Sequence, residues 1–173
     1  MQVYARDNRN NQQVSRMKII LLTIGQTDDL WLRDAIETYM QRINRYTGFS
    51  IHNIPVPKKW NSLSPKQRKE HEGKLLLEQV KESDYTVLLD EKGKAFSSVQ
   101  FAGFIQERMN RSTRKLLFIV GGPWGFSPEV YRKAQMQLSL SAMTFSHQMV
   151  RLFFTEQLYR AFTILKNEPY HNG

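Results

Sequence analysis

The sequence predicts an α/β fold with a mostly parallel sheet of five or six strands and helices on both faces. Two observations support this prediction. Short apolar runs rich in β-branched residues alternate along the chain with amphipathic helical patterns, which is typical of a parallel sheet covered by helices. The chain has 173 residues, 40% of them hydrophobic, which is enough for one domain with a substantial core.

The strands and helices can be placed from these patterns. The strand candidates are Lys18 to Ile24, Phe49 to Val56, Tyr85 to Leu89, Lys115 to Val120 and Gln137 to Ser141. Serine followed by proline is typical of a helix start, because serine caps the first turn and proline fits its first position. The helix candidates are Leu32 to Ile43, a helix opened by Ser64 and Pro65, Ser98 to Met109, a short helix opened by Ser127 and Pro128, and Gln148 to Lys166.

The domain is expected to begin at Met17. Residues 1–16 are rich in Asn and Gln and offer almost nothing apolar to bury, so we interpret them as a disordered tail or an upstream extension. Residues 17–173 then form a single domain, in which we find no internal repeat.

Composition excludes several classes of protein and site. The chain has no cysteine, which excludes disulfides, thiolate catalysis and cysteine zinc sites, and its four histidines are too scattered to suggest a metal centre. The apolar runs are strand-sized and far shorter than a membrane span, and the first residues do not form a targeting peptide. We therefore expect a cytoplasmic protein without metal and without membrane contact.

The charge balance favours a polyanionic partner. The 25 Lys and Arg residues exceed the 16 Asp and Glu residues by nine, and the sequence pI is about 9.9. Phosphate backbones attract such an excess, so a nucleic acid is a plausible ligand. The alternative is that these side chains form solvated surfaces with no specific partner.

Three predicted strands end in unusual loops, which are Leu89 to Lys94, Gly121 to Phe126 and Ser141 to His147. Ligands of open parallel sheets bind outside the carboxyl ends of the strands, so these loops form the candidate site. Glycines such as Gly121 and Gly122 let the backbone approach a ligand or adopt a positive φ. They could equally form only a tight turn between strand and helix.

The third loop leads into the last helix. The segment Leu140 to Phe145 is small and mostly apolar, and the helix amides after it could hold an adenine or methionyl group; packing under the helix is the alternative. His147 and Arg151 share one face of the first turns. A cation there opposes the helix dipole unless an anion lies nearby, which makes Arg151 a functional candidate. His147 could also be an ordinary surface histidine.

The last helix has a second apolar edge beside its core stripe, formed by Met149, Leu152 and Tyr159. This edge suggests a homodimer, since a twofold contact needs only one self-complementary patch, although it could also complete the single core. Tyr170 and His171 lie in a terminus that would normally fray, so they either dock at a useful place or have no role.

Taken in order, these motifs resemble the RlmH family, which are SPOUT-class methyltransferases of the bacterial ribosome. The resemblance runs from Met17 to His171 and rests on Leu89-Asp90, Gly121-Gly122-Pro123-x-Gly125, Leu140 to Phe145, His147-Gln148-x-x-Arg151, Glu156-Gln157-x-Tyr159-Arg160-Ala161 and Pro169-Tyr170-His171. It implies S-adenosylmethionine as methyl donor and N3 of a pseudouridine in large-subunit (23S) ribosomal RNA as acceptor, on the assembled ribosome. It also implies a C-terminal trefoil knot.

The resemblance assigns roles to individual residues. The donor pocket would use Leu89, Gly121, Gly122, Leu140, Ser141, Ala142, Met143, Thr144 and Phe145. The RNA side would use His147, Arg151, Tyr170 and His171, with the tail of one subunit completing the site of its partner. His147 or His171 could assist loss of the N3 proton, and no metal is required.

Two features depart from the family, and two other functions stay open. Ser146 stands where relatives commonly have proline, and the chain ends in Asn172-Gly173 where a charged residue is usual. Both departures concern RNA contact and leave the donor pocket intact. The alternatives are a non-catalytic basic module that binds RNA or the ribosome, and a SPOUT enzyme that acts on another RNA.

Overall fold

A five-stranded parallel sheet forms the centre of the protein. The computed structural model describes residues 17–82 and 84–171, so residues 1–16 and Asn172-Gly173, of which the sequence made predictions, lie outside it. Neighbouring strands pair in the order β2-β1-β4-β3-β5, and every pair among the described residues is parallel. The strands are β1 (Lys18–Ile24), β2 (Gly48–Ile54), β3 (Tyr85–Ala95), β4 (Lys115–Val120) and β5 (Met136–Ser139).

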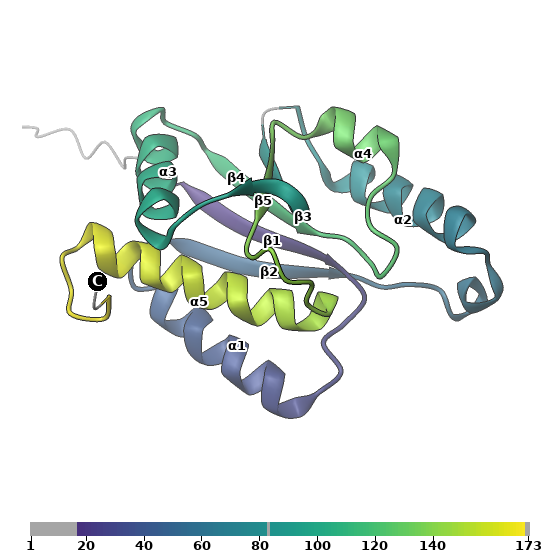
Figure 1. Ribbon diagram of the computed structural model, residues 1–173, viewed down its shortest axis with the longest axis horizontal. Helices are drawn as coiled ribbons and strands as arrows, with labels where there is room; N and C mark the ends of the chain where they lie inside the picture. Colours follow the sequence, from purple (N-terminus) through teal and green to yellow (C-terminus); the bar gives the residue numbers. More distant parts are fainter. Residues whose placement is uncertain (1–16, 83, 172–173) are drawn as a thin grey trace, which may run out of the picture.

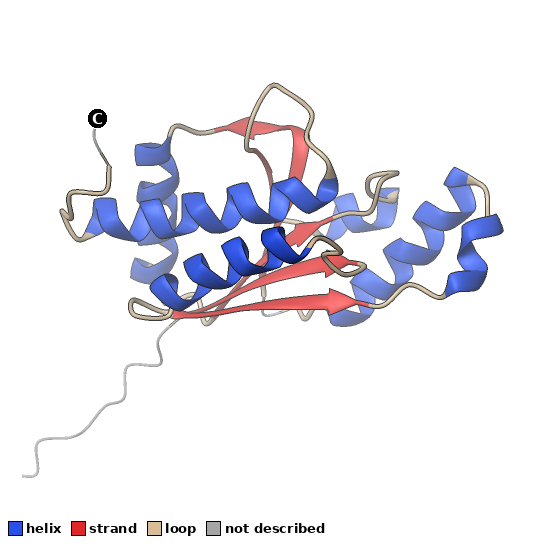
Figure 2. Ribbon diagram, turned by 90° about the horizontal axis from the view of Figure 1, so that it is seen from below, coloured by secondary structure: helices blue, strands red, loops and turns tan. Residues whose placement is uncertain are grey.

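Helices cover both faces of this sheet, as predicted (Figures 1 and 2). One face is covered by α1 (Leu30–Ile43), α3 (Ser98–Asn110) and α5 (His147–Leu165), and α5 packs between the other two. The other face carries α2 (Pro65–Gln79) and the short α4 (Pro128–Lys133), which contact each other; the 3-10 helix η1 (Lys58–Ser62) precedes α2. The result is a three-layer α/β/α arrangement.

Alternation along the strands divides the core into two parts. Side chains of successive strand residues point to opposite faces. Phe118 of β4 is fully buried toward α5, where its ring lies 4.6 Å from that of Phe154, whereas its neighbour Ile119 is buried in the cluster under α2 and α4. Both faces are apolar, which explains why the strands are continuous hydrophobic runs in the sequence.

Serine side chains cap three of the helices, at Ser64 for α2, Ser97 for α3 and Ser146 for α5. Ser64 caps α2 with Pro65 in the first turn, as predicted, and it also forms a reciprocal capping box with Gln67. The last helix begins at His147, one residue earlier than expected, because the Ser146 hydroxyl accepts a hydrogen bond from the backbone N–H of Met149. The residue that departs from the family's proline is therefore the cap of α5.

The expected cap at Ser127 is wrong in one respect. Pro128 does occupy the first turn of α4, but the Ser127 side chain makes no capping hydrogen bond. Its hydroxyl is buried against α2 instead, so close to Gly73 that a Cβ at Gly73 would lie 2.4 Å from it. Helix packing therefore takes precedence over local capping at this position.

β3 is longer than predicted. Leu89 and Lys94 both pair with Leu138 of β5, so the residues between them leave the ladder and the strand then resumes as far as Ala95. Gly93 makes this return possible, because a Cβ there would lie 2.6 Å from the backbone of Gln137. Such bulges turn side chains out of a sheet and often lie beside functional sites.

No helix in the described part of the chain is long and apolar enough to cross a membrane. The C-terminal knot stays a prediction of the family resemblance.

Candidate functional site

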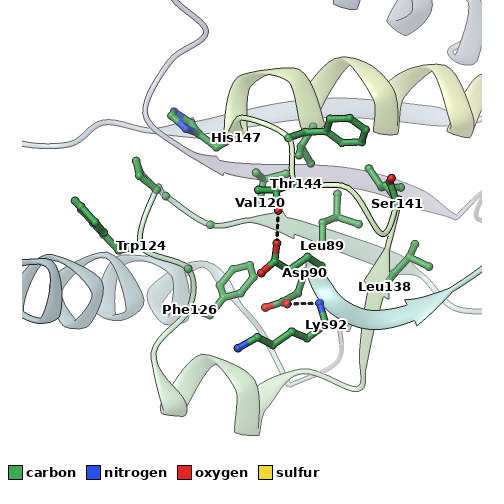
Figure 3. A pocket seen from close by; sticks show the side chains of 18 of the residues that line it. Leu89, Asp90, Lys92, Val120, Trp124, Phe126, Leu138, Ser141, Thr144 and His147 are labelled. Carbon is green, nitrogen blue, oxygen red and sulfur yellow. Dashed lines mark hydrogen bonds between the residues drawn. The ribbon is translucent and has the colours of Figure 1, made fainter.

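A cavity of about 600 Å³ opens at the carboxyl edge of the sheet (Figure 3). Its size is in the range of small-molecule sites. The three loops predicted from the sequence all contribute to its walls. Of the nine residues predicted to bind the donor, Leu89, Gly121, Gly122, Leu140, Ser141, Met143, Thr144 and Phe145 line the cavity, while Ala142 is exposed and does not.

Glycine is favoured at three positions of the loop after β4, for a different structural reason at each. Gly125 has φ +74°, a conformation that other residues rarely adopt. A Cβ on Gly122 would lie 2.3 Å from the buried carboxylate of Glu72, and one on Gly121 would lie 3.1 Å from the ring of Phe126. The glycines therefore let the loop pack closely on α2 and on Phe126, which brings the loop backbone to the cavity.

The floor of the cavity is polar and acidic. Asp90 accepts hydrogen bonds from the Tyr131 hydroxyl and, at 2.8 Å, from the backbone N–H of Lys92. Glu91 accepts one from the Thr144 hydroxyl at 2.9 Å, which links the β3 bulge to the loop before α5 (Figure 3). Burial and the neighbouring Asp90 raise the pKa of Tyr131, so this phenol remains a hydrogen-bond donor.

Sequence reasoning assigned no role to Asp90, Glu91 or Tyr131. Asp90 and Glu91 lie in the predicted loop after β3, so their place at the strand end could have identified them as candidate site residues. No local pattern identifies Tyr131, because its contact with Asp90 spans 41 residues and depends on how α4 packs. Lys69 and Lys92 line the cavity beside the two carboxylates, and its apolar walls include Val120, Leu138 and Val150. The cavity therefore suits a small organic ligand that carries charged groups.

His147 is the first residue of α5 and lines the cavity, half-buried. Burial, together with the charge of Arg151, lowers the pKa of His147 below its usual value of 6.5. The imidazole is therefore neutral at neutral pH, with a nitrogen free to accept a proton.

Arg151 does not occupy the open position expected for it. Its side chain is only 1% exposed and is not among the residues that line the cavity. The guanidinium donates to the Thr27 hydroxyl at 2.9 Å and to the carbonyl of Ile24 at 2.8 Å. Arg151 thus ties the loop after β1 to α5, and the carbonyl dipole takes the place of the expected anion.

A neighbouring contact strengthens this connection. The side-chain amide of Gln148 donates to the Asp28 carboxylate and accepts from the Asp28 backbone N–H, both at 2.9 Å. Two successive turns of α5 are therefore fixed to the loop after β1, which holds His147 at the rim of the cavity.

Tyr170 and His171 follow the C-terminal end of α5, and Tyr170 folds back against the C-terminal half of this helix. Tyr170 packs against Tyr159 with ring centroids 4.7 Å apart, and its hydroxyl donates to Glu156 at 3.1 Å. Glu156 and Tyr159 stand 9 and 12 residues after His147 in α5, so at 1.5 Å per residue they lie about 14 and 18 Å from it along the helix axis. One chain therefore does not bring the four residues predicted for the RNA side together.

The described residues contain no group of three or more His, Asp or Glu side chains that could hold a metal ion.

Replacement of Arg151 by lysine should destabilise the fold. A lysine cannot make both directional bonds, so we expect Arg151→Lys to lower the free energy of unfolding by roughly 1.5–3 kcal/mol. Urea denaturation measures this loss. Arg33→Lys, on the exposed face of α1, is the matched control and should change the free energy by less than about 0.5 kcal/mol. Equal stability of the two variants would contradict the structural role of Arg151.

Acid should weaken the fold partly through His147. The unfolded chain protonates this histidine at about pH 6.5, above its pKa in the folded protein, so stability falls as the pH drops through 6.5. His147→Gln should therefore lose less stability than the wild type between about pH 7.5 and about pH 5.5. Urea denaturation at both pH values tests this, with exposed His52→Gln as the control for loss of an imidazole. A loss equal to that of the wild type would show that the His147 pKa is not lowered.

Known proteins are similar in sequence to this chain over nearly its whole length. The family model described as a predicted SPOUT methyltransferase matches residues 17–171. Proteins named Ribosomal RNA large subunit methyltransferase H from Christiangramia forsetii, Flavobacterium johnsoniae and Porphyromonas gingivalis are 56%, 52% and 49% identical to it. Each alignment covers 90% of this chain and 99% of the relative.

Among solved structures, the chain overlaps with the SpoU methyltransferase AviRb from Streptomyces viridochromogenes at a TM-score of 0.45 and 14% identity, over 88% of this chain and 60% of that one. The match of residues 17–171 to the family model and the identity of about half of the aligned residues to these relatives show that the chain belongs to the RlmH family of SPOUT methyltransferases.

Proposed function

We propose that this protein transfers a methyl group from S-adenosylmethionine to N3 of a pseudouridine in large-subunit ribosomal RNA, on the assembled ribosome in the cytoplasm. The observation that carries the proposal is the cavity in which the three strand-end loops meet. Family membership, the names of the relatives and the net charge of +9 support a methyltransferase with an RNA substrate.

The residues of the cavity fit this donor. S-adenosylmethionine carries a sulfonium and an ammonium group, and the carboxylates of Asp90 and Glu91 line the cavity. Apolar side chains of Leu138, Leu140 and Phe145 would hold the adenine, and the backbone of the glycine loop would lie against the rest of the donor. Bound there, the donor supplies a methyl group on a good leaving group.

The protein's own contribution is alignment and proton transfer. The C–S bond of the donor breaks as a C–N bond forms at N3; the sulfur keeps the electron pair as a thioether, and N3 loses its proton. His147 is neutral and borders the cavity, so its imidazole nitrogen would accept that proton, with His171 as the alternative. Arg151 would act as a positioning residue, because its contacts hold the start of α5 and not a ligand.

A homodimer would reunite the residues that one chain separates. Since Tyr170 packs on Glu156 and Tyr159, more than two turns of α5 away from His147, the tail of a second copy would have to supply Tyr170 and His171 to the cavity. Leu30 and Trp31, in the first turn of α1, are 68% and 58% exposed. The start of α1 is joined to the start of α5 by the contact between Asp28 and Gln148, and the first turns of α5 carry the half-buried Met149 and Leu152, so these apolar side chains are candidates for such a contact. Tyr159 contributes less than expected, because it packs within its own chain.

Donor binding should depend on Gly121. Valine at this position would push Phe126 into the cavity, so we expect the affinity for S-adenosylmethionine to fall more than about tenfold, by calorimetry. Gly103→Val, where a Cβ would meet no atom within 4 Å, is the matched control. Unchanged binding in Gly121→Val would remove this loop from the site, and no binding by the wild type would favour a non-catalytic RNA-binding module.

The acceptor can be identified by mass spectrometry of ribosomal RNA from a strain that lacks the gene. A methylpseudouridine should be absent from the large-subunit RNA, and purified protein with S-adenosylmethionine should restore it on isolated ribosomes. Loss of a methyl group from another RNA instead would assign the enzyme to a different substrate.

Mixed subunits test the shared site. His147→Ala and Tyr170→Ala should each be inactive, but refolding them together should recover about one quarter of the wild-type activity, because half of the dimers are mixed and each has one intact site. A mixture of His147→Ala with Gly121→Val, which alter the same side of the site, should recover none. Equal recovery in both mixtures, or none in either, would contradict a site shared between subunits.

A further inference from the structure

A basic segment stands at the edge of the sheet where the cavity opens. We define the basic arm as residues 57–71, which comprise η1 and the first turns of α2. The arm contains five lysine or arginine side chains and a single carboxylate, Glu70. Its cationic residues are Lys58, Lys59, Lys66, Arg68 and Lys69.

The fold places the arm beside the cavity. β2 ends at Ile54, at the same carboxyl edge as the three site loops, and the chain passes directly from there into η1 and α2 (Figure 1). Lys69 lines the cavity, as does Trp124, whose indole is 50% exposed. The arm therefore forms a positively charged surface that continues from the rim of the cavity.

Internal contacts give the basic arm a defined conformation. The ring centroids of Trp60 and His71 lie 5.0 Å apart, and this contact connects η1 to α2. Arg68 forms an ion pair with the buried Glu72 at 2.9 Å and donates to Asn61 at 3.3 Å. Arg68 thus stabilises the arm through its contacts with Glu72 and Asn61, and the arm needs no partner to adopt its conformation.

Three lysines of the arm do not take part in these internal contacts. Lys58, Lys59 and Lys66 are exposed, and none of the three forms an ion pair with another residue in the described ranges. Three exposed ammonium groups without an ion pair among the described residues favour a polyanionic ligand such as a phosphate backbone.

We infer that the basic arm binds the RNA phosphate backbone next to the nucleotide that enters the cavity, and that Trp124 offers a stacking surface between the two. The inference rests on the proposed function, because it takes the ligand of the arm to be the RNA that contains the acceptor. RNA sites of this kind combine a cationic track with an exposed aromatic ring. Phosphate contacts fix position and carry no sequence information, so the arm would orient the substrate and leave base selection to the cavity.

The test compares two triple variants of equal charge. Lys58→Ala, Lys59→Ala and Lys66→Ala remove the exposed charges of the arm without touching a residue that lines the cavity. Lys18→Ala, Arg111→Ala and Arg114→Ala remove three exposed charges at the opposite, amino edge of the sheet and serve as the matched control. Both variants should keep the wild-type melting temperature and affinity for S-adenosylmethionine.

Binding to isolated assembled ribosomes and to protein-free large-subunit RNA is measured over a range of salt concentrations. For the arm variant we expect affinity to fall about tenfold or more at about 150 mM salt, and the slope of log K against log salt to decrease by roughly two, as for the loss of two to three phosphate contacts. The control variant should lose less than about threefold, because it changes only the long-range field of the protein.

Each outcome has a distinct meaning. Equal affinity and salt slope in the two variants, with wild-type binding and methylation intact, would overturn the role of the arm and leave the proposed function standing. Weaker binding of the arm variant to the ribosome but not to protein-free RNA would also overturn it, because the arm would then bind an acidic protein. A wild type that binds neither probe would overturn the proposed function and the inference together.

Discussion

The parallel pairing of β3, β4 and β5 is the constraint on which the rest of this structure depends. Parallel neighbours end at the same edge of a sheet, so the loops that follow three strands must converge there. That convergence produces the cavity without any dedicated domain. It also requires crossover connections on both faces, and the helices that make these connections bury the two halves of the core.

Close packing at this edge determines which residues the loops can contain. Gly122 lies where α2 presents Glu72, and Gly93 lies where the backbone of β5 passes. Arg151 and Gln148 join α5 to the loop after β1 across more than a hundred residues of sequence. Residues that resemble ligand-binding groups in the sequence thus include several that act by holding the walls of the site in place.

The site divides into parts with different chemistry. The cavity has apolar walls and both acidic and basic side chains, its rim carries a neutral histidine, and the basic arm continues the rim. The cavity can therefore hold a small charged organic molecule, whereas the arm attracts a polyanion. The tail residues Tyr170 and His171 are separated from this site within one chain, so the proposed site would be complete only in a dimer.

The sequence by itself determined the strands, the helices and the loops that form the cavity. β4 has the predicted bounds, and the cap at Ser64 lies where expected, because periodicity and caps are properties of residues close together in the chain. Only the tertiary structure decided that Arg151 is buried, that Tyr131 meets Asp90, that β3 resumes as far as Ala95 and that Tyr170 lies far from His147. These features are contacts between distant segments, or depend on such contacts, and their energies arise from packing that no local pattern encodes.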